Sequence, residues 1–457
     1  MIGNAAPAGR KWAAHPVRAA GILEWISALL GLSLGGCFTD LTVPSCRTPG
    51  DCPADYTACL HSLCFFRNTG CEEAGPVSGD GCCSGWEADR SPDGDCRTFD
   101  LALEMSEFSQ PAVRTSDGTL FFHGRSSRDG RVHLLQVTSR GDPVWDLPLG
   151  TAEILLPPVL RDDDTVLSPV PKGIQIVDVA RRQAIDLIPS PAPPAGPLCA
   201  TDDALAWVDR DGSIHLFHPG SGRRVVLPGE GDGLPPVHSR QADAFLVARS
   251  DGSLRGLSPE ATSAADAITA TLDLGTRIAA PPVIAGERAL VVTESGTLIA
   301  VSLAKTPWHR AWETNLGGPS PVAPLVDSRG RILVIREDGT LFVVREVRGQ
   351  GVVAGSVALP EAGASPALLI TGAGRIVHFR DGRLRSLLVR EEGGGLVFSE
   401  GFSYAVDGRQ VVPVLVDRRI VLALDTGHVL GLVSPEGPDP GPWSRPLGDE
   451  ANRMSGP

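Results

Sequence analysis

The chain has 457 residues, more than one hydrophobic core usually holds unless that core is built from repeats. Its 53 glycines and 39 prolines, set against 5% aromatic residues, favour many short strands joined by turns over a helical protein. The formal net charge of −13 argues against nucleic-acid binding, because a polyanion would repel this chain.

The first 36 residues have the parts of an export signal. Basic residues precede an apolar run over residues 25–34, which is too short to cross a bilayer as a stable helix. Small residues and Cys37 follow, and this ending resembles the lipobox of bacterial lipoproteins. The resemblance implies that Cys37 becomes an acylated N-terminus, and that Phe38, in place of an aspartate, directs the protein to the outer membrane. A plain secretory signal, with Cys37 as an ordinary thiol, is the alternative.

Residues 37–97 are predicted to form a small spacer module held together by disulfides. This stretch of an exported chain holds an even number of cysteines besides Cys37: Cys46, Cys52, Cys59, Cys64, Cys71, Cys82, Cys83 and Cys96. The first four resemble the small cysteine-rich repeats of exported bacterial lipoproteins, the other four are interpreted as a second unit of this kind, and the pairing of all eight is left open. Zinc is the other chemistry available to cysteines, but the stretch has no Cys-x-x-Cys pair. Asp89, Asp93 and Asp95 lack the spacing of a calcium loop and are interpreted as turn residues.

Residues 98–449 contain a repeated hairpin turn. A polar residue followed by Gly, between two apolar runs, predicts a tight turn in which the glycine takes a positive φ. These glycines recur every 39 to 45 residues, at Gly130, Gly173, Gly212, Gly252, Gly296, Gly339, Gly382 and Gly427. A proline that opens an apolar strand recurs in phase with them, at Pro111, Pro158, Pro197, Pro236, Pro282, Pro324, Pro366 and Pro413. Two markers with one period predict eight copies of one structural unit.

The sixth repeat illustrates the unit, with four short apolar stretches at residues 323–328, 331–336, 340–347 and 351–359. The second and fifth residues after the turn glycine point to opposite faces of a strand, and each is apolar in seven of the eight repeats. Such a strand must be covered on both sides. The predicted fold class is therefore all-β, an eight-bladed β-propeller of four-stranded antiparallel blades. Either residues 98–103 or residues 442–447 are expected to close the ring, and residues 450–457 to be a disordered tail.

The order of a proline, an apolar pair, Asp-Gly-Thr-Leu and a late tryptophan resembles the repeat of pyrroloquinoline quinone (PQQ)-type propellers. Trp145, Trp312 and Trp443 stand where that family docks one blade on the next. The family includes quinone-dependent dehydrogenases and a non-catalytic branch, which contains the propeller lipoprotein of the outer-membrane β-barrel assembly machinery. A lipobox followed by PQQ-like repeats resembles the second branch.

A quinone dehydrogenase would need PQQ, calcium and a general-base aspartate, but the predicted innermost strands hold no cluster of carboxylates. Cys82 and Cys83 resemble the adjacent cysteine pair of the enzymes, yet they belong to the module before the ring. Cys199 is expected to be a buried thiol that packs as a small apolar side chain. Residues 161–165 are interpreted as a hairpin turn. The histidines of the ring are interpreted as polar residues at scattered strand positions: His123, His133, His215, His218 and His238.

We therefore expect a non-catalytic, lipid-anchored propeller of the bacterial cell envelope, without cofactor or metal. It would bind an envelope protein or peptide through the loops of its rim or the edge of a blade. A PQQ- and calcium-dependent oxidoreductase is the first alternative, and a surface sensor of carbohydrates or other ligands is the second. The expected location is the outer membrane, on its periplasmic or surface face, with secretion as the alternative.

Overall fold

The computed structural model describes residues 58–60, 63–65, 97–109, 112–229, 233–359, 367–380, 382–393, 395–408, 413–416, 419–434, 438–439 and 455–456. The chain divides into two compact units, Met1–Phe66 and Arg67–Pro457. In the first unit, β1 (Ala58–Leu60) and β2 (Leu63–Phe65) form an antiparallel hairpin in which Cys59 lies opposite Cys64. Cys37, the six other cysteines of the predicted disulfide module and Asp89, Asp93 and Asp95 lie outside the described residues.

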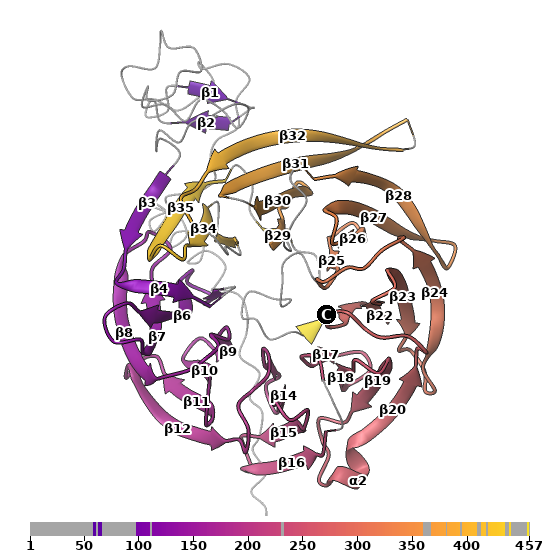
Figure 1. Ribbon diagram of the computed structural model, residues 1–457, viewed down its shortest axis with the longest axis horizontal. Coiled ribbons are helices and arrows are strands. Elements are labelled where there is room, and N and C mark those ends of the chain that lie inside the picture. Colours follow the sequence, from indigo (N-terminus) through magenta and orange to yellow (C-terminus); the bar gives the residue numbers. More distant parts are fainter. Residues whose placement is uncertain are drawn as a thin grey trace, which may run out of the picture. The chain divides into compact units, whose positions relative to one another are not determined.

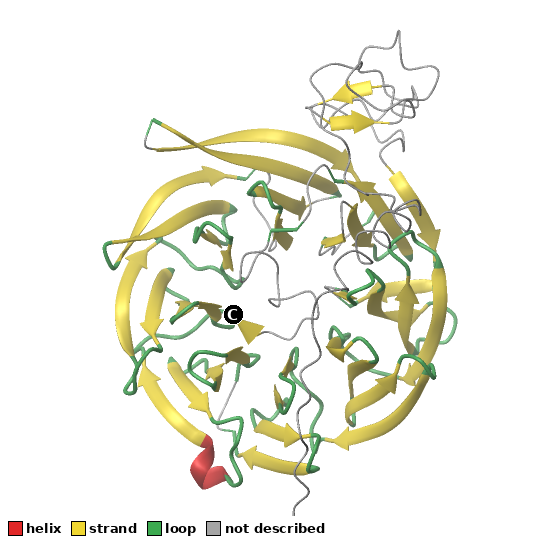
Figure 2. Ribbon diagram, turned by 180° about the vertical axis from the view of Figure 1, so that it is seen from behind, coloured by secondary structure: helices red, strands yellow, loops and turns green. Residues whose placement is uncertain are grey.

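The second unit is a ring of sheets, and its described residues form eight of them (Figure 1). Each sheet is one blade of an antiparallel meander, whose strands follow one another from the centre of the ring to its outside. Figure 2 shows that strands and short connections make up nearly all of the described ring. The predicted fold class, an all-β, eight-bladed propeller with four-stranded blades, is confirmed.

The first four blades contain these strands, in order from the inside of the ring to the outside. Blade 1 has β4 (Met105–Phe108), β5 (Val113–Arg114), β6 (Leu120–Ser126), β7 (Val132–Val137) and β8 (Pro143–Gly150). Blade 2 has β9 (Val159–Asp162), β10 (Thr165–Val170), β11 (Gly173–Asp178) and β12 (Gln183–Pro189). Blade 3 has β13 (Cys199–Ala200), β14 (Leu205–Val208), β15 (Ile214–His218) and β16 (Arg223–Leu227). Blade 4 has β17 (Val237–Ser239), β18 (Ala244–Ala248), β19 (Ser253–Leu257) and β20 (Ile268–Asp273).

The other four blades follow the same order. Blade 5 has β21 (Val283–Ala285), β22 (Arg288–Val292), β23 (Thr297–Ser302) and β24 (His309–Asn315). Blade 6 has β25 (Leu325–Val326), β26 (Ile332–Ile335), β27 (Thr340–Val347) and β28 (Gln350–Ala358). Blade 7 has β29 (Ala367–Ile370), β30 (Arg375–Arg380), β31 (Arg383–Glu392) and β32 (Gly395–Ala405). Blade 8 has β33 (Val414–Val416), β34 (Arg419–Ala423), β35 (His428–Val433) and, as its outermost strand, β3 (Arg97–Ala102).

The N-terminal strand of the ring closes it. β3 pairs antiparallel with β35, with Leu101 opposite Val429 and Ala102 opposite His428. Of the two closures that the sequence left open, residues 98–103 therefore supply the missing strand of blade 8. Blade 1 departs from the simple pattern, because its innermost strand is split into β4 and β5, which both pair with β6.

Seven of the eight predicted turn glycines lie between the second and third strands of their blades, and the eighth, Gly173, is the first residue of β11; all have a positive φ, from +70° at Gly130 to +139° at Gly173. Only glycine adopts this region without steric cost. We call the side of the ring that carries these turns and the links between blades the glycine face. The turns that join strands one to two and three to four lie on the second face, because consecutive strands are antiparallel.

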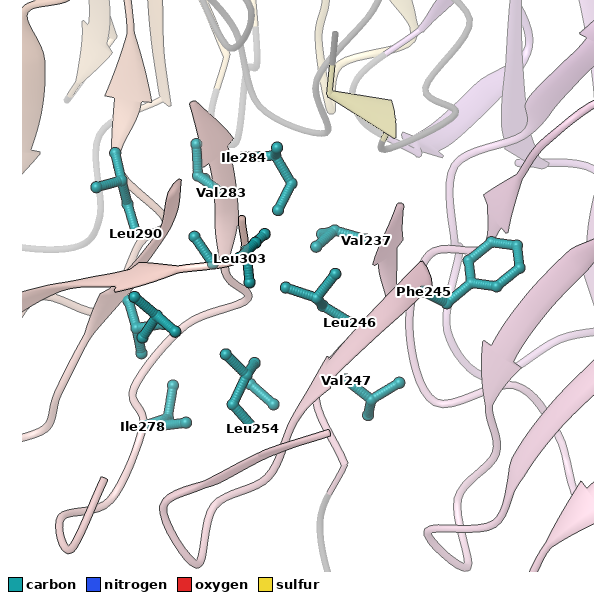
Figure 3. Packing of buried hydrophobic residues seen from close by; sticks show 14 of the residues in the cluster. Val237, Phe245, Leu246, Val247, Leu254, Ile278, Val283, Ile284, Leu290 and Leu303 are labelled. Atoms are coloured by element: carbon teal, nitrogen blue, oxygen red, sulfur yellow. The ribbon is translucent and has the colours of Figure 1, made fainter. Parts of the chain in front are cut away.

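Apolar side chains packed between neighbouring blades form the core. One cluster joins Phe121 and Leu134 of blade 1 to Leu160 and Val166 of blade 2. A larger cluster runs from blade 3 to blade 6, and Figure 3 shows part of it around Leu246. This packing explains why strands in the middle of a blade are apolar on both faces. Burying one such side chain stabilises the fold by roughly 1.5–3 kcal/mol.

Two of the three tryptophans in the predicted docking positions lie at contacts between blades. Trp145 on β8 packs against the cluster that blades 1 and 2 share. Trp312 on β24 lies over Gly351 on β28, where an added Cβ would come within 2.4 Å of the Trp312 ring. Trp443 lies outside the described residues.

Two local features depart from the sequence predictions. A short helix, α2 (Ala264–Ala267), interrupts the strands and turns that the composition favours, and Asp266 accepts hydrogen bonds from the backbone N–H and the hydroxyl of Ser263 at its start. Within the tail expected to be disordered, Ser455–Gly456 form a strand, β36, which pairs in parallel with β17. The expected disorder therefore does not extend to these two residues, because the inner edge of β17 offers them backbone partners.

Candidate functional site

A pocket on the glycine face lies where blades 1, 2 and 3 meet, and we call it the rim pocket. Its volume is about 410 Å³. It is lined by the link from blade 1 to blade 2, the turn between β10 and β11, the link from blade 2 to blade 3, and Arg210: Thr151, Ala152, Glu153, Ile154, Leu156, Pro169, Val170, Pro171, Pro193, Pro194 and Arg210. Most of these side chains are apolar, and prolines in two of the lining segments, the turn between β10 and β11 and the link from blade 2 to blade 3, fix the backbone there.

Side chains of β6 hold the wall formed by the link from blade 1 to blade 2. The Arg125 guanidinium donates to the carbonyl oxygens of Ala152 (2.7 Å) and Glu153 (3.2 Å). The His123 ring, 1% exposed, lies 2.7 Å from the Leu156 carbonyl oxygen through Nδ1 and 3.0 Å from the Ser168 hydroxyl through Nε2. A carbonyl can only accept, so Nδ1 carries the proton and Nε2 accepts from Ser168. Burial lowers the pKa of His123 to about 4, so the ring is neutral at physiological pH.

The wall formed by the link from blade 2 to blade 3 is held from blade 3. The Arg210 backbone N–H donates to the Pro193 carbonyl (2.9 Å), and Pro194 forms an antiparallel bridge with Asp209. Just upstream, Arg224 donates to the Pro189 carbonyl (2.5 Å) and Trp207 Nε1 to the Ser190 hydroxyl (3.3 Å). The link therefore contacts blade 3 along its length.

Beneath this wall lies a buried polar cluster of blade 3. Asp209 Oδ2 is 2.6 Å from His215 Nε2, and the Arg224 guanidinium donates to His215 Nδ1 at 2.7 Å. The His215 ring stacks on Trp207 with 4.8 Å between centroids, and Arg224 lies over the same indole. Burial, followed by the charge of Arg224, lowers the pKa of His215 to about 4. The cluster supports the pocket wall and has no contact with solvent through Asp209 or His215, whose side chains are both 0% exposed.

One ion pair stands at the opening of the rim pocket. Arg210 Nη1 lies 2.6 Å from Glu153 Oε2, and this hydrogen bond lowers the pKa of the Glu153 carboxyl. Glu153 is mostly exposed, so the pair contributes little to stability and leaves both charges accessible to a ligand. Ile154 beside it is 56% exposed, the largest exposed fraction among the large apolar side chains of the described residues. The opening thus combines an apolar side chain with one charge of each sign.

A smaller pocket of about 220 Å³ lies on the second face between blades 3 and 4. Its lining comes from the first turn of blade 3, the first turn of blade 4 and the loop before α2: Ala200, Thr201, Asp202, Asp203, His238, Arg240, Asp243, Pro259 and Glu260. Burial lowers the pKa of His238, and its Nδ1 has no hydrogen-bond partner. This pocket is more polar than the rim pocket, and four carboxylates stand at its exposed edge.

The ring histidines do not converge. His133 on β7 pairs with Asp146 at 2.9 Å, and His218 lies beside Arg223, whereas His123, His215 and His238 belong to three different blades. No group of three or more His, Cys, Asp or Glu side chains that could hold a metal ion occurs within the described residues.

Other predicted residues take ordinary structural positions. Cys199 on β13 is fully buried in the apolar cluster that begins in blade 3. Residues 161–165 form the hairpin turn between β9 and β10, as we expect from the sequence. Cys82 and Cys83 lie outside the described residues. Among the described residues, no helix is both long enough and apolar enough to cross a membrane.

Comparison with solved structures supports the fold assignment. BamB from Moraxella catarrhalis is similar over 74% of this chain and 99% of its own, with a TM-score of 0.56 and 14% sequence identity. A computationally designed protein, Ika8, is similar over 73% of this chain and 98% of its own, with a TM-score of 0.54 and 14% identity. At this identity the likeness shows the propeller fold alone. No model of a known protein family matches the chain, and neither does any curated protein sequence.

The sequence did not reveal the rim pocket, although one signal was present. The stretch Ser190–Gly196 reads SPAPPAG, a proline-rich link between two of the repeats. A rigid apolar segment on the rim is a candidate binding surface. The side chains that hold the pocket were missed for another reason, because Arg125 and His123 bond to backbone carbonyls about thirty residues away, and no sequence pattern encodes a carbonyl acceptor.

Proposed function

We propose that this protein is a non-catalytic propeller, anchored by lipid in the bacterial cell envelope, and that it binds another envelope protein through the rim pocket. Two observations support a binding role. The pocket walls are held by hydrogen bonds from buried or half-buried side chains of two blades, so the pocket is rigid before a ligand arrives. Its only ionisable lining residues, Glu153 and Arg210, are paired with each other.

The composition of the rim pocket carries the proposal. General acid–base or nucleophilic catalysis needs a titratable group or nucleophile beside a base. The one carboxylate in the lining, Glu153, is paired with Arg210 and has no His, Cys, Lys or Tyr beside it in the lining. The prolines and aliphatic side chains offer apolar contact area at a low entropic cost. A volume of about 410 Å³ suits a few apolar side chains of an extended segment or loop. The Glu153–Arg210 pair would orient the charged or polar flank of that segment.

The place in the envelope rests on the N-terminal sequence. The lipobox-like ending at Cys37 favours acylation, and the propeller fold shared with BamB is compatible with an envelope scaffold. Metabolic labelling with an alkyne-tagged fatty acid tests the anchor: the protein should incorporate the label, and Cys37→Ser should abolish it. Labelling that persists in Cys37→Ser, or no labelling of the unaltered protein, would reject the lipid anchor. Neither result would bear on the proposal that the rim pocket binds a protein.

Site-specific photocrosslinking in intact cells tests the binding role. A photoactivatable residue at Ile154 probes the pocket opening, and the same residue at Ile185 on β12, 50% exposed, serves as a matched control on the outside of blade 2. We expect a reproducible crosslinked protein from position 154 that position 185 does not yield. Equal capture at both positions, or none at position 154, would reject the rim pocket as the binding site.

The alternative enzyme function has its own readout. Purified protein incubated with PQQ and calcium should show neither a bound quinone chromophore nor reduction of an electron-acceptor dye if the non-catalytic proposal is correct. Dye reduction that depends on added PQQ would establish the oxidoreductase instead.

A further inference from the structure

The smaller pocket, between blades 3 and 4 on the second face, contains a buried side chain whose hydrogen-bonding capacity is not used. His238 on β17 is 7% exposed and lines this pocket, and its Nδ1 has no hydrogen-bond partner among the described residues. A buried polar atom without a partner is rare in folded proteins, because leaving it unpaired costs free energy. The imidazole therefore offers a ligand in the pocket a hydrogen bond that the protein itself does not make.

The His238 ring lies on the side of blade 4 that faces blade 3, where the pocket lies. His238 and Phe245 are directly opposite each other on β17 and β18, so their side chains share one face of the blade, and their ring centroids are 5.0 Å apart. Figure 3 shows Phe245 pointing away from Val283 and Leu290 of blade 5. The opposite side of blade 4 faces blade 3, and Ala200 of that blade lines the pocket with His238.

Negative charge dominates the opening of this pocket. Its described lining sets four carboxylates against one guanidinium, that of Arg240, and the four carboxylates belong to exposed residues: Asp202, Asp203, Asp243 and Glu260. His238 adds no positive charge at physiological pH, because burial lowers its pKa. The charge of the lining therefore favours a cation over an anion or a neutral ligand.

An organic cation fits the lining better than a metal ion. Within the part of the chain that the structure describes, no three His, Cys, Asp or Glu side chains are grouped so that they could hold a metal. The pocket also has apolar walls, which include Ala200 and Pro259. A primary ammonium group can donate to a neutral imidazole, and its methylene groups can contact such walls. The volume of about 220 Å³ equals about seven water molecules at ~30 Å³ each, which leaves room for a short alkyl chain.

Hydrogen bonds fix the two turns that carry the aspartates. In blade 3, Thr201 Oγ1 accepts from the backbone N–H of Ala204 at 3.0 Å. In blade 4, the Ser239 hydroxyl accepts from the backbone N–H of Ala242 at 3.2 Å. Asp243 completes this second turn with a φ of +45°, a region in which Asn and Asp are enriched among residues other than glycine. Because both turns are ordered in advance, a ligand pays little entropy to organise them.

We propose that the pocket between blades 3 and 4 binds a primary alkylammonium group, carried either by a free short amine or by a lysine side chain. The His238 imidazole accepts a hydrogen bond from the ammonium group, and Asp202, Asp203 and Asp243 supply the surrounding negative charge. The site lies on the second face, opposite the rim pocket, and does not depend on the function proposed there.

Isothermal titration of the full chain with two amines tests the proposal. The probes are 1,5-diaminopentane and Nα-acetyl-lysine N-methylamide, and the control is Nα-acetyl-norleucine N-methylamide, which lacks the ammonium group. We expect saturable binding of at least one probe and none of the control. Tighter binding of the diamine would support a free amine as the ligand, and tighter binding of the lysine derivative would support a lysine side chain. No saturable binding of either probe, or equal binding of the control, would overturn the proposal.

Two variants locate the binding site. Asp203→Asn combined with Asp243→Asn should weaken binding roughly tenfold, and so should His238→Phe, because each removes acceptors for a charged donor. Asp164→Asn is the matched control, since Asp164 is an exposed residue in the first turn of blade 2 on the same face of the ring. Its affinity should not change. Unchanged affinity in both pocket variants, or an equal loss in Asp164→Asn, would overturn the assignment of the site.

The unaltered protein provides a test that does not require His238→Phe to fold. In protein with carbon-13-labelled histidine, the His238 imidazole signal should shift when the bound probe is added. The signal of His123, 1% exposed in blade 1, should stay in place. A His238 signal that does not move at saturating probe concentration would overturn the proposal.

Discussion

Asp209 and His215 form a buried hydrogen bond of 2.6 Å in blade 3, and neither side chain is exposed to solvent. The guanidinium of Arg224 can only donate, so His215 Nδ1 accepts from it and the ring proton lies on Nε2, which donates to the Asp209 carboxylate. Arg224 also holds the Pro189 carbonyl, at the start of the link that forms one wall of the rim pocket. A buried polar cluster and the shape of a binding surface are thus joined through one side chain.

Removing the imidazole from this pair should be costly. His215→Phe removes the donor to Asp209 Oδ2 and leaves only the Ser213 backbone N–H donating to Oδ1, so we expect the free energy of unfolding to fall by about 2–3 kcal/mol. The matched control is His133→Phe in blade 1, whose partner Asp146 is 58% exposed at 2.9 Å, and a loss of no more than about 1 kcal/mol is expected there. Urea unfolding of both variants provides the comparison. Equal losses would mean that burial of the Asp209–His215 pair does not matter.

The free energy of unfolding should fall at acid pH because of His123. Its folded pKa, about 4, lies below the ordinary value of about 6.5, so the unfolded chain takes up a proton first and folding loses free energy as the pH falls from about 6.5 to about 4. The loss from this one group is on the order of 3 kcal/mol at pH 4, and there is none above pH 7. Asp209 acts with the opposite sign, because burial raises its folded pKa to about 7 and its contribution is lost as the pH rises from about 4 to about 7.

His123→Gln isolates the contribution of His123 to the pH dependence of stability, since Asp209 and His215 are present in both proteins. The stability difference between the unaltered protein and His123→Gln should be greatest at pH 7 and shrink steadily to pH 4.5 in urea titrations at several pH values. A difference that stays constant with pH would show that His123 titrates normally in the fold.

Two turn glycines should respond differently to alanine. Both require a positive φ, but a Cβ at Gly296 would lie 2.0 Å from the Gly318 carbonyl oxygen, whereas a Cβ at Gly130 meets nothing within 4 Å. Gly130→Ala should therefore cost only about 1–2 kcal/mol from backbone strain, and Gly296→Ala clearly more. Thermal unfolding compares the two variants. If Gly130→Ala proves the more damaging, steric contact with Gly318 is not what excludes a side chain at Gly296.

Gly351 should tolerate no side chain because of Trp312. Gly351→Ala places a Cβ 2.4 Å from the indole and from Thr314 Oγ1, which should force the two blades apart and cost about 1–3 kcal/mol. Gly395→Ala in the outer hairpin of blade 7 is the control, since the nearest atom to its Cβ is 3.9 Å away and its φ is not in the left-handed region. Near-ultraviolet circular dichroism reports the Trp312 environment in each variant. An unchanged tryptophan signal in Gly351→Ala would contradict the docking contact.

The repeat could be predicted from the sequence because two structural constraints select particular residues in the blades. A tight turn needs glycine, and an innermost strand tolerates a proline directly before it, as Pro158 before β9 and Pro282 before β21 show. Ring closure was not readable, because any short apolar stretch can pair with an open strand edge. The pairing of β3 with β35 in the structure shows which stretch closes the ring.

The polar contacts that hold the rim pocket could not be predicted from the sequence, for a physical reason. We interpreted His123 and His215 as scattered polar strand residues, and each does lie within a strand. Their partners are a backbone carbonyl, a hydroxyl 45 residues away and a guanidinium on the next strand, which only the packing of blades brings together. The helix α2 could have been expected, since Ser263 followed three residues later by Asp266 is the pattern of a capped N-terminus.

Binding at the rim pocket can be measured with the protein that position 154 captures. Isothermal titration of that partner should give at least tenfold weaker binding to Ile154→Asp than to the unaltered propeller, because a carboxylate beside Glu153 opposes an apolar segment at the pocket opening. Ile185→Asp, on the outer strand of blade 2, should bind with unchanged affinity. Equal affinities for all three proteins, or a loss that Ile185→Asp shares, would contradict a binding role for this pocket.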